Sequence, residues 1–116
     1  MNLDNAVLAH HVWKTHLKSV IANKGRIDAE VVRRDDCCEI GQWLHGEGAR
    51  AYGHTPQFTA LMDKHKVFHV EAGKVAAFVN TARYDEAARM VEGGTPFAAA
   101  SLAVGMAVKA LQSISV

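Results

Sequence analysis

The sequence has few of the residues that mark disulfide-rich or nucleic-acid-binding proteins. Its 116 residues include two cysteines, two prolines and 7% aromatic residues. The cysteines, Cys37 and Cys38, are adjacent, and neighbouring cysteines rarely pair because the required geometry strains the backbone. The net charge is +1, so there is no broad excess of basic residues to hold phosphates. We therefore expect neither a disulfide framework nor a nucleic-acid partner.

No stretch has the form of a membrane span or a secretory signal. The longest run without charge, residues 93–108, is short for a bilayer and rich in glycine, serine and alanine. Residues 1–14 have no basic segment followed by an apolar one. These absences predict a reduced, cytoplasmic protein with no membrane partner.

Alanine and helical periodicity are abundant. Apolar residues make up 49% of the chain, and its length suits one domain that buries a core without disulfides. We expect a single all-α domain over residues 1–116. Apolar residues recurring at steps of three and four predict helices. The predicted helices cover residues 3–22, 37–45, 56–80, 84–92 and 96–113, with one further turn beginning at Asp28.

Two histidines share one face of the predicted helix over residues 56–80. His65 and His69 are four residues apart, and both lie within the apolar stripe of that helix. A neutral imidazole on such a stripe would bury unsatisfied nitrogens, unless a metal takes one and a hydrogen bond takes the other. A single buried histidine is, however, more often a hydrogen-bonded core residue than a ligand. The pair makes a metal site a serious alternative.

A cysteine and a third histidine strengthen the metal interpretation. Asp36 and Glu39 have the spacing of a capping box, which places Cys38 in the opening turn of a short helix, where a thiol loses its proton more easily. Two imidazoles and one thiolate are three ligands of a tetrahedral zinc site. The fourth ligand must come from a distant helix, and His10, in the middle of the stripe over residues 3–22, is the best candidate.

Three neighbouring residues have open roles. Cys37 is either a bystander or a second thiol that can ligate the metal or pair with an oxidised Cys38. Asp35 and Asp36 are a cap and a solvated charge, unless one of them hydrogen-bonds a ligand from outside.

Three sequence blocks together resemble the signature of the CZB domain, the chemoreceptor zinc-binding domain. In order along residues 7–111 they are His10-x-x-Trp13-Lys14, Cys38-x-Ile40-Gly41-x-Trp43-Leu44 and His65-x-x-Phe68-His69. The resemblance implies an antiparallel four-helix bundle with a short extra helix that carries the cysteine ligand. It also implies one zinc ion, held by His10, Cys38, His65 and His69. The Trp-Lys pair follows at the offset that selects His10 over His11.

The residues argue against an enzyme. The His65–His69 pair has the spacing of a zinc-protease helix, but Lys66 stands where that helix carries its glutamate base. Four protein ligands would also leave no open position for water. The resemblance instead implies a stand-alone sensor of zinc, of oxidants such as hypochlorous acid through the zinc-bound cysteine, or of both. By the same resemblance it would feed chemotaxis or cyclic-di-GMP signalling.

Two alternatives remain beside the sensor. One is a purely structural zinc-stabilised helical dimerisation module, and the other is a haem or iron bundle. The absence of a Glu-x-x-His pair argues against a di-iron site. Residues 97–116 carry a single charge, Lys109, so we expect this last helix to be buried on more than one side, as in a homodimer. The resemblance adds a chemoreceptor or diguanylate cyclase partner in trans.

Overall fold

The computed structural model describes the backbone of residues 3–36 and 38–114, and the side chains of residues 12–36, 38 and 40–114. Over this part of the chain all regular structure is helical, which confirms the all-α class. The helices are α1 (Leu3–Ala22), α2 (Ala29–Val32), α3 (Glu39–Leu44), α4 (Glu47–Tyr52), α5 (Pro56–Asn80), α6 (Tyr84–Met90) and α7 (Pro96–Gln112).

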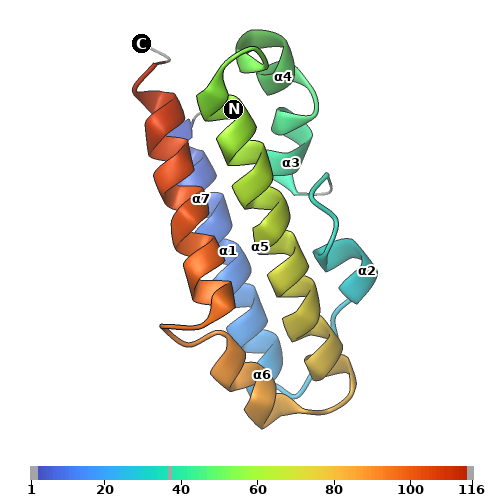
Figure 1. Cartoon of the computed structure of the whole chain (residues 1–116). Coiled ribbons are helices and arrows are strands. Elements are labelled where there is room, and N and C mark those ends of the chain that lie inside the picture. Colours follow the sequence, from blue (N-terminus) through green and yellow to red (C-terminus); the bar gives the residue numbers. More distant parts are fainter. Residues whose placement is uncertain (1–2, 37, 115–116) are drawn as a thin grey trace.

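Three long helices form the body of the molecule, which measures 44 × 25 × 19 Å. Helices α5 and α7 share the largest interface, and α1 packs behind both (Figure 1). α1 and α5 run in the same direction, and α7 runs in the opposite one (Figure 1). The short helices α2, α3 and α4 return along the other flank of α5 (Figure 1). The described residues thus hold three long helices, with a broken run of short ones beside them.

The long helices α5 and α7 begin with the same local device. The hydroxyl of Thr55 accepts a hydrogen bond from the amide of Phe58 at 3.1 Å, and Thr95 does the same for Ala98 at 3.2 Å. A proline follows each threonine at a position where a helix needs no amide donor. The observed bounds of α5 agree with those predicted, as do those of α1. Helix α7 ends one residue before its predicted end.

The core lies where the predicted stripes meet. The rings of Phe68 on α5 and Phe97 on α7 lie 5.3 Å apart at its centre. The other buried apolar side chains on the long helices are Leu17, Ile21, Phe58, Leu61, Ala72, Val75, Ala76, Val79, Ala100, Val104, Val108 and Leu111. Fully burying one large apolar side chain contributes roughly 1.5–3 kcal/mol, so this interface is the main source of stability.

The cap of α3 differs from the prediction. Cys38, and not Asp36, is the N-cap, because its backbone is extended (φ −83°, ψ 166°) and its Sγ accepts from the amide of Gly41 at 3.3 Å. The carboxylate of Asp36 instead accepts from the guanidinium of Arg34 at 3.1 Å. The expected capping box is therefore wrong, and α3 begins at Glu39.

Helix α4 is not among the predicted helices, since it follows Gly46 and contains Gly48, and glycines commonly end a helix. Gly48 in fact lies inside α4 and is buried against the indole of Trp43. A Cβ at this position would lie 2.7 Å from Cε3 of that ring. The glycine is therefore a packing contact between α3 and α4, which no local pattern reveals. The turn that begins at Asp28 is confirmed as α2.

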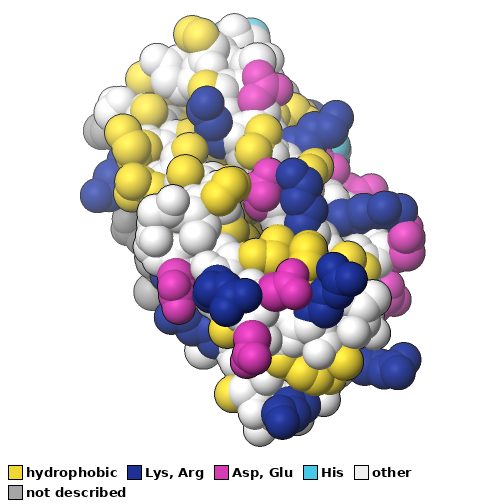
Figure 2. All heavy atoms as spheres, turned by 60° about the horizontal axis from the view of Figure 1, so that its bottom comes forward, with side chains coloured by type: hydrophobic (Ala, Val, Ile, Leu, Met, Phe, Trp, Pro, Cys, Tyr) yellow, Lys and Arg dark blue, Asp and Glu magenta, His cyan; other side chains and the backbone are white. Residues whose placement is uncertain are grey.

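The surface carries both signs of charge. On the face shown in Figure 2, lysine and arginine side chains alternate with aspartate and glutamate. Among the described residues no helix has the length and apolar character that crossing a membrane requires.

Candidate metal centre

Three side chains converge in the interior between α3 and α5. His65 and His69 lie on consecutive turns of α5, both with no exposed surface, and their Nε2 atoms are 3.0 Å apart. The Sγ of Cys38 lies 3.2 Å from Nε2 of His65 and 3.4 Å from Nε2 of His69. Among the side chains that the structure describes, these three have donor atoms that lie close enough to one another to hold a metal ion.

The triangle of donor atoms fits a tetrahedral zinc ion. Zinc bonds of about 2.0–2.1 Å to nitrogen and 2.3 Å to sulfur place ligand atoms about 3.3–3.6 Å from one another. The observed separations of 3.0–3.4 Å are close to these values. Two imidazole nitrogens and one sulfur are also a donor set that zinc favours. The three residues therefore supply one face of a tetrahedron, and a fourth ligand would lie opposite it.

Gly41 determines where the sulfur lies. Its amide donates to Cys38 Sγ, and the carbonyl oxygen of Asp35 occupies the space that a side chain would need. A Cβ at Gly41 would lie only 1.8 Å from that oxygen. The spacing of Cys38 and Gly41 thus produces a tight turn that presents the sulfur toward α5.

Burial determines the protonation of the three donors. It lowers the pKa of His65 to about 3, and the nearby His69 adds to this effect. Burial also lowers the pKa of His69, against the opposing effect of its hydrogen bond to the Val32 carbonyl. For Cys38, burial raises the pKa of the thiol, against the opposing effect of the Gly41 amide. The imidazoles are neutral and ready to ligate, whereas the cysteine releases a proton when a metal binds.

The imidazole of His69 is positioned by one hydrogen bond and two aromatic rings. Its Nδ1 lies 2.7 Å from the carbonyl oxygen of Val32, which can only accept, so Nδ1 donates and Nε2 is left for the cluster. Trp13 of α1 meets the ring edge-on, with centroids 5.7 Å apart, and Phe68 does so at 5.3 Å. The Val32 carbonyl was missed at the sequence level, because a backbone oxygen leaves no signature in a motif.

The other predicted residues have different outcomes. The side chain of His10 lies outside the described residues, so its role as fourth ligand stays a prediction; its backbone belongs to α1, one turn before Trp13. Cys37 also lies outside the described residues. Asp35 directs its carboxylate to His45, at 3.5 Å.

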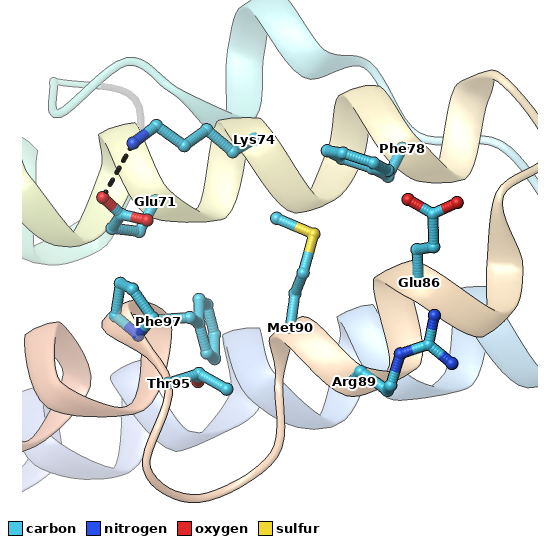
Figure 3. Close-up of a pocket in the computed structure, with 9 residues that line it drawn as sticks. Glu71, Lys74, Phe78, Glu86, Arg89, Met90, Thr95 and Phe97 are labelled. Atoms are coloured by element: carbon cyan, nitrogen blue, oxygen red, sulfur yellow. Dashed lines mark hydrogen bonds and ion pairs between the residues drawn. The ribbon is translucent and has the colours of Figure 1, made fainter.

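Away from the three converging side chains, a hollow of about 480 Å³ lies between α5, α6 and the start of α7 (Figure 3). Met90 and Phe97 lie near its middle, and Lys74 binds Glu71 on one side at 3.0 Å (Figure 3). Its lining includes none of the three cluster residues. The hollow is therefore separate from the candidate metal centre.

Comparison with known protein families supports the geometric interpretation. The model of the family described as "Chemoreceptor zinc-binding domain" (CZB) matches residues 10–76, more than half of the chain. The chain belongs to the CZB domain family. Neither the curated proteins nor the solved structures give a match. All three motifs of this CZB domain lie within the matched region, and its Cys38, His65 and His69 form a group that could hold a metal ion.

Proposed function

We propose that this CZB domain binds one zinc ion through His10, Cys38, His65 and His69 and acts as a regulatory sensor. The observation that carries the proposal is the convergence of Cys38 Sγ on two buried Nε2 atoms, at 3.2 and 3.4 Å. With His10 as fourth ligand the site is closed to water, which favours a sensor over an enzyme. The domain comprises residues 1–116 and works in the cytoplasm, with α2 to α4 as the fourth leg of the family's antiparallel four-helix bundle.

The proposed signal is zinc itself, an oxidant such as hypochlorous acid, or both. Cys38 is the partly exposed member of the described group, whereas both histidines are fully buried. A thiolate is also the ligand that oxidants attack most readily. Hypochlorous acid would transfer its oxygen to the sulfur, which loses two electrons and becomes a sulfenic acid, while chlorine leaves as chloride. Since Cys38 also caps α3, its oxidation would loosen that helix and the zinc ligation together.

The proposed partner is a second copy of the chain. A hollow of about 330 Å³ between α1 and α7 is lined by Lys14, Ala98, Ser101, Leu102, Gly105, Met106 and Lys109. Leu102 and Met106 are 67% and 65% exposed there. No atom of the described residues lies near the space that a Gly105 side chain would take, so another helix could approach closely. A homodimer through this face would pass the zinc or redox signal to a chemoreceptor or diguanylate cyclase in trans.

Native mass spectrometry of protein purified without added metal tests the proposal directly. We expect a dimer with one zinc per chain, and loss of zinc with addition of oxygen at Cys38 after hypochlorous acid. Cys37→Ser is the matched control and should respond like the wild type, whereas Cys38→Ser should lose both zinc and response. Zinc that survives oxidant and chelator would favour the purely structural module. A folded protein without zinc would contradict the metal site.

A further inference from the structure

A segment of the chain that belongs to none of the three sequence motifs lies against the metal centre. Residues 24–33, which comprise the α1–α2 connection, α2 and its C-cap, pack along α5. We call this segment the strap. Near one end, the carbonyl of Val32 accepts from Nδ1 of His69 at 2.7 Å. The strap therefore supplies the hydrogen bond that leaves Nε2 of His69 to face Cys38 and His65.

The far end of the strap is tied to the C-terminal end of α5. The side-chain amide of Asn80 accepts from the backbone of Ile27 at 3.0 Å and donates to the carbonyl of the same residue at 2.6 Å. The single hydroxyl hydrogen of Tyr84 is shared between the carbonyl oxygens of Lys24 and Gly25, which lie 2.9 and 3.2 Å from the hydroxyl oxygen. These bonds join residues more than 50 positions apart and anchor the strap independently of the metal ligands.

A glycine sets the distance between the strap and α5. Gly73 lies one turn beyond His69 and is buried. A Cβ at Gly73 would lie 2.6 Å from Cβ and 3.3 Å from Cα of Arg33, the residue after Val32. Glycine inside a helix costs about 1 kcal/mol relative to alanine, so close packing is the gain that offsets this cost.

We propose that Gly73 and the strap position His69 for metal binding. By letting α2 approach α5, Gly73 keeps the Val32 carbonyl within reach of Nδ1, fixes the tautomer and aims Nε2 at the site. Gly73 and Asn80 are thus positioning residues of the site. This inference rests on the proposed function for its effect on zinc affinity, and on the structure alone for its effect on the tautomer.

The main experiment compares zinc affinities of three variants with the wild type in a competition titration. Gly73→Ala should weaken binding by about 10- to 100-fold, the usual cost of losing an outer partner of a ligand. Gly93→Ala, at a glycine in the α6–α7 connection where no atom of the described residues lies within 4 Å of the added Cβ, is the control and should bind like the wild type. Adding Arg33→Gly to Gly73→Ala removes the Cβ that the new methyl group meets, so this double variant should recover most of the affinity.

A second readout follows the tautomer of His69 in metal-free protein, through proton–nitrogen correlations of the imidazole. We expect the Nδ1–H form in the wild type, a changed population in Gly73→Ala and recovery in the double variant. An Nε2–H wild type, or an affinity and tautomer unchanged by Gly73→Ala, would overturn the proposal. Failure of the wild type to bind zinc would refute the proposed function, while the tautomer would still test the strap.

Asn80→Ala covers the case in which Gly73→Ala does not fold. It releases the far end of the strap without adding an atom to the core. We expect a smaller loss of zinc affinity, together with the same change of His69 tautomer. A folded Asn80→Ala variant that matches the wild type in both readouts would show that the strap does not position His69.

Discussion

The two sides of the candidate metal centre are built in opposite ways. On one side, the 25-residue helix α5 carries His65 and His69 on consecutive turns, fully buried in the main core. On the other side, Cys38 is the N-cap of the six-residue helix α3 and is partly exposed. The spacing of the histidines follows from helix geometry alone, whereas the sulfur depends on a turn that Gly41 and the Asp35 backbone must form together.

Because of this difference, the histidine side should stay folded without metal, whereas the cysteine side should respond to metal binding. The α5 side is held by packing against α7 and needs no metal to keep its two nitrogens together. The cysteine side gains more from a metal, because one bond to sulfur ties a short helix to the core. Variants on each side should therefore fail differently, and the following changes, ordered by expected effect, test this.

Phe68→Ala tests the packed side. The Phe68 ring is fully buried against Phe97, so its loss should destabilise the protein by about 3–5 kcal/mol. Urea unfolding of metal-free protein, followed by circular dichroism, measures this. A loss below about 1 kcal/mol would mean that the α5–α7 contact is not the main core.

Gly41→Ala tests the cysteine side. The new methyl group cannot fit beside the Asp35 carbonyl, so the turn must open and carry Cys38 Sγ away from the histidines. We expect a loss of about 1–3 kcal/mol and of bound zinc, with the helices α5 and α7 retained. Zinc content after gel filtration and the helical circular dichroism signal report the two effects. Full zinc content in this variant would show that the turn does not position the sulfur.

Acid tests the buried imidazoles in metal-free protein. Since the pKa of His65 is lowered to about 3, the folded state stays unprotonated there while the unfolded state takes up protons below about pH 6.5. The contribution of neutral His65 to stability should be fully present above pH 6.5 and fall as the pH drops toward 3, by up to about 1.4 kcal/mol per pH unit. Urea midpoints between pH 7.5 and 4.5 measure the slope. A His65→Leu variant should show a shallower slope, and an equal slope would contradict this origin.

Gly105→Ala should have the smallest effect. It replaces a glycine in the interior of α7, where no atom of the part of the chain that the structure describes crowds the new methyl group. We expect a gain of up to about 1 kcal/mol in urea unfolding at a concentration too low for dimers. Destabilisation under these conditions would mean that α7 is closer to its neighbours than the structure has it.

The same contrast explains what could be predicted from the sequence. The bounds of α1 and α5 could be predicted because apolar periodicity and Thr-Pro caps are local signals. The His65–His69 pair could be placed on one face for the same reason. The cap of α3 and the existence of α4 could not, because both depend on contacts such as that of Gly48 with Trp43. Gly73, one turn after His69, was the available signal for close approach of another segment.

The edge-on contact between Trp13 and His69 gives the protein an optical reporter of its own. The indole of Trp13 lies on α1, yet its ring stands within 5.7 Å of an imidazole of the candidate centre. Its emission should therefore respond to the charge and ligation of that imidazole. The other tryptophan, Trp43, packs against Tyr52 and Phe58 instead. A Trp43→Phe protein would leave Trp13 as its single tryptophan, so metal uptake and release could be followed in real time by selective tryptophan excitation, without an added dye.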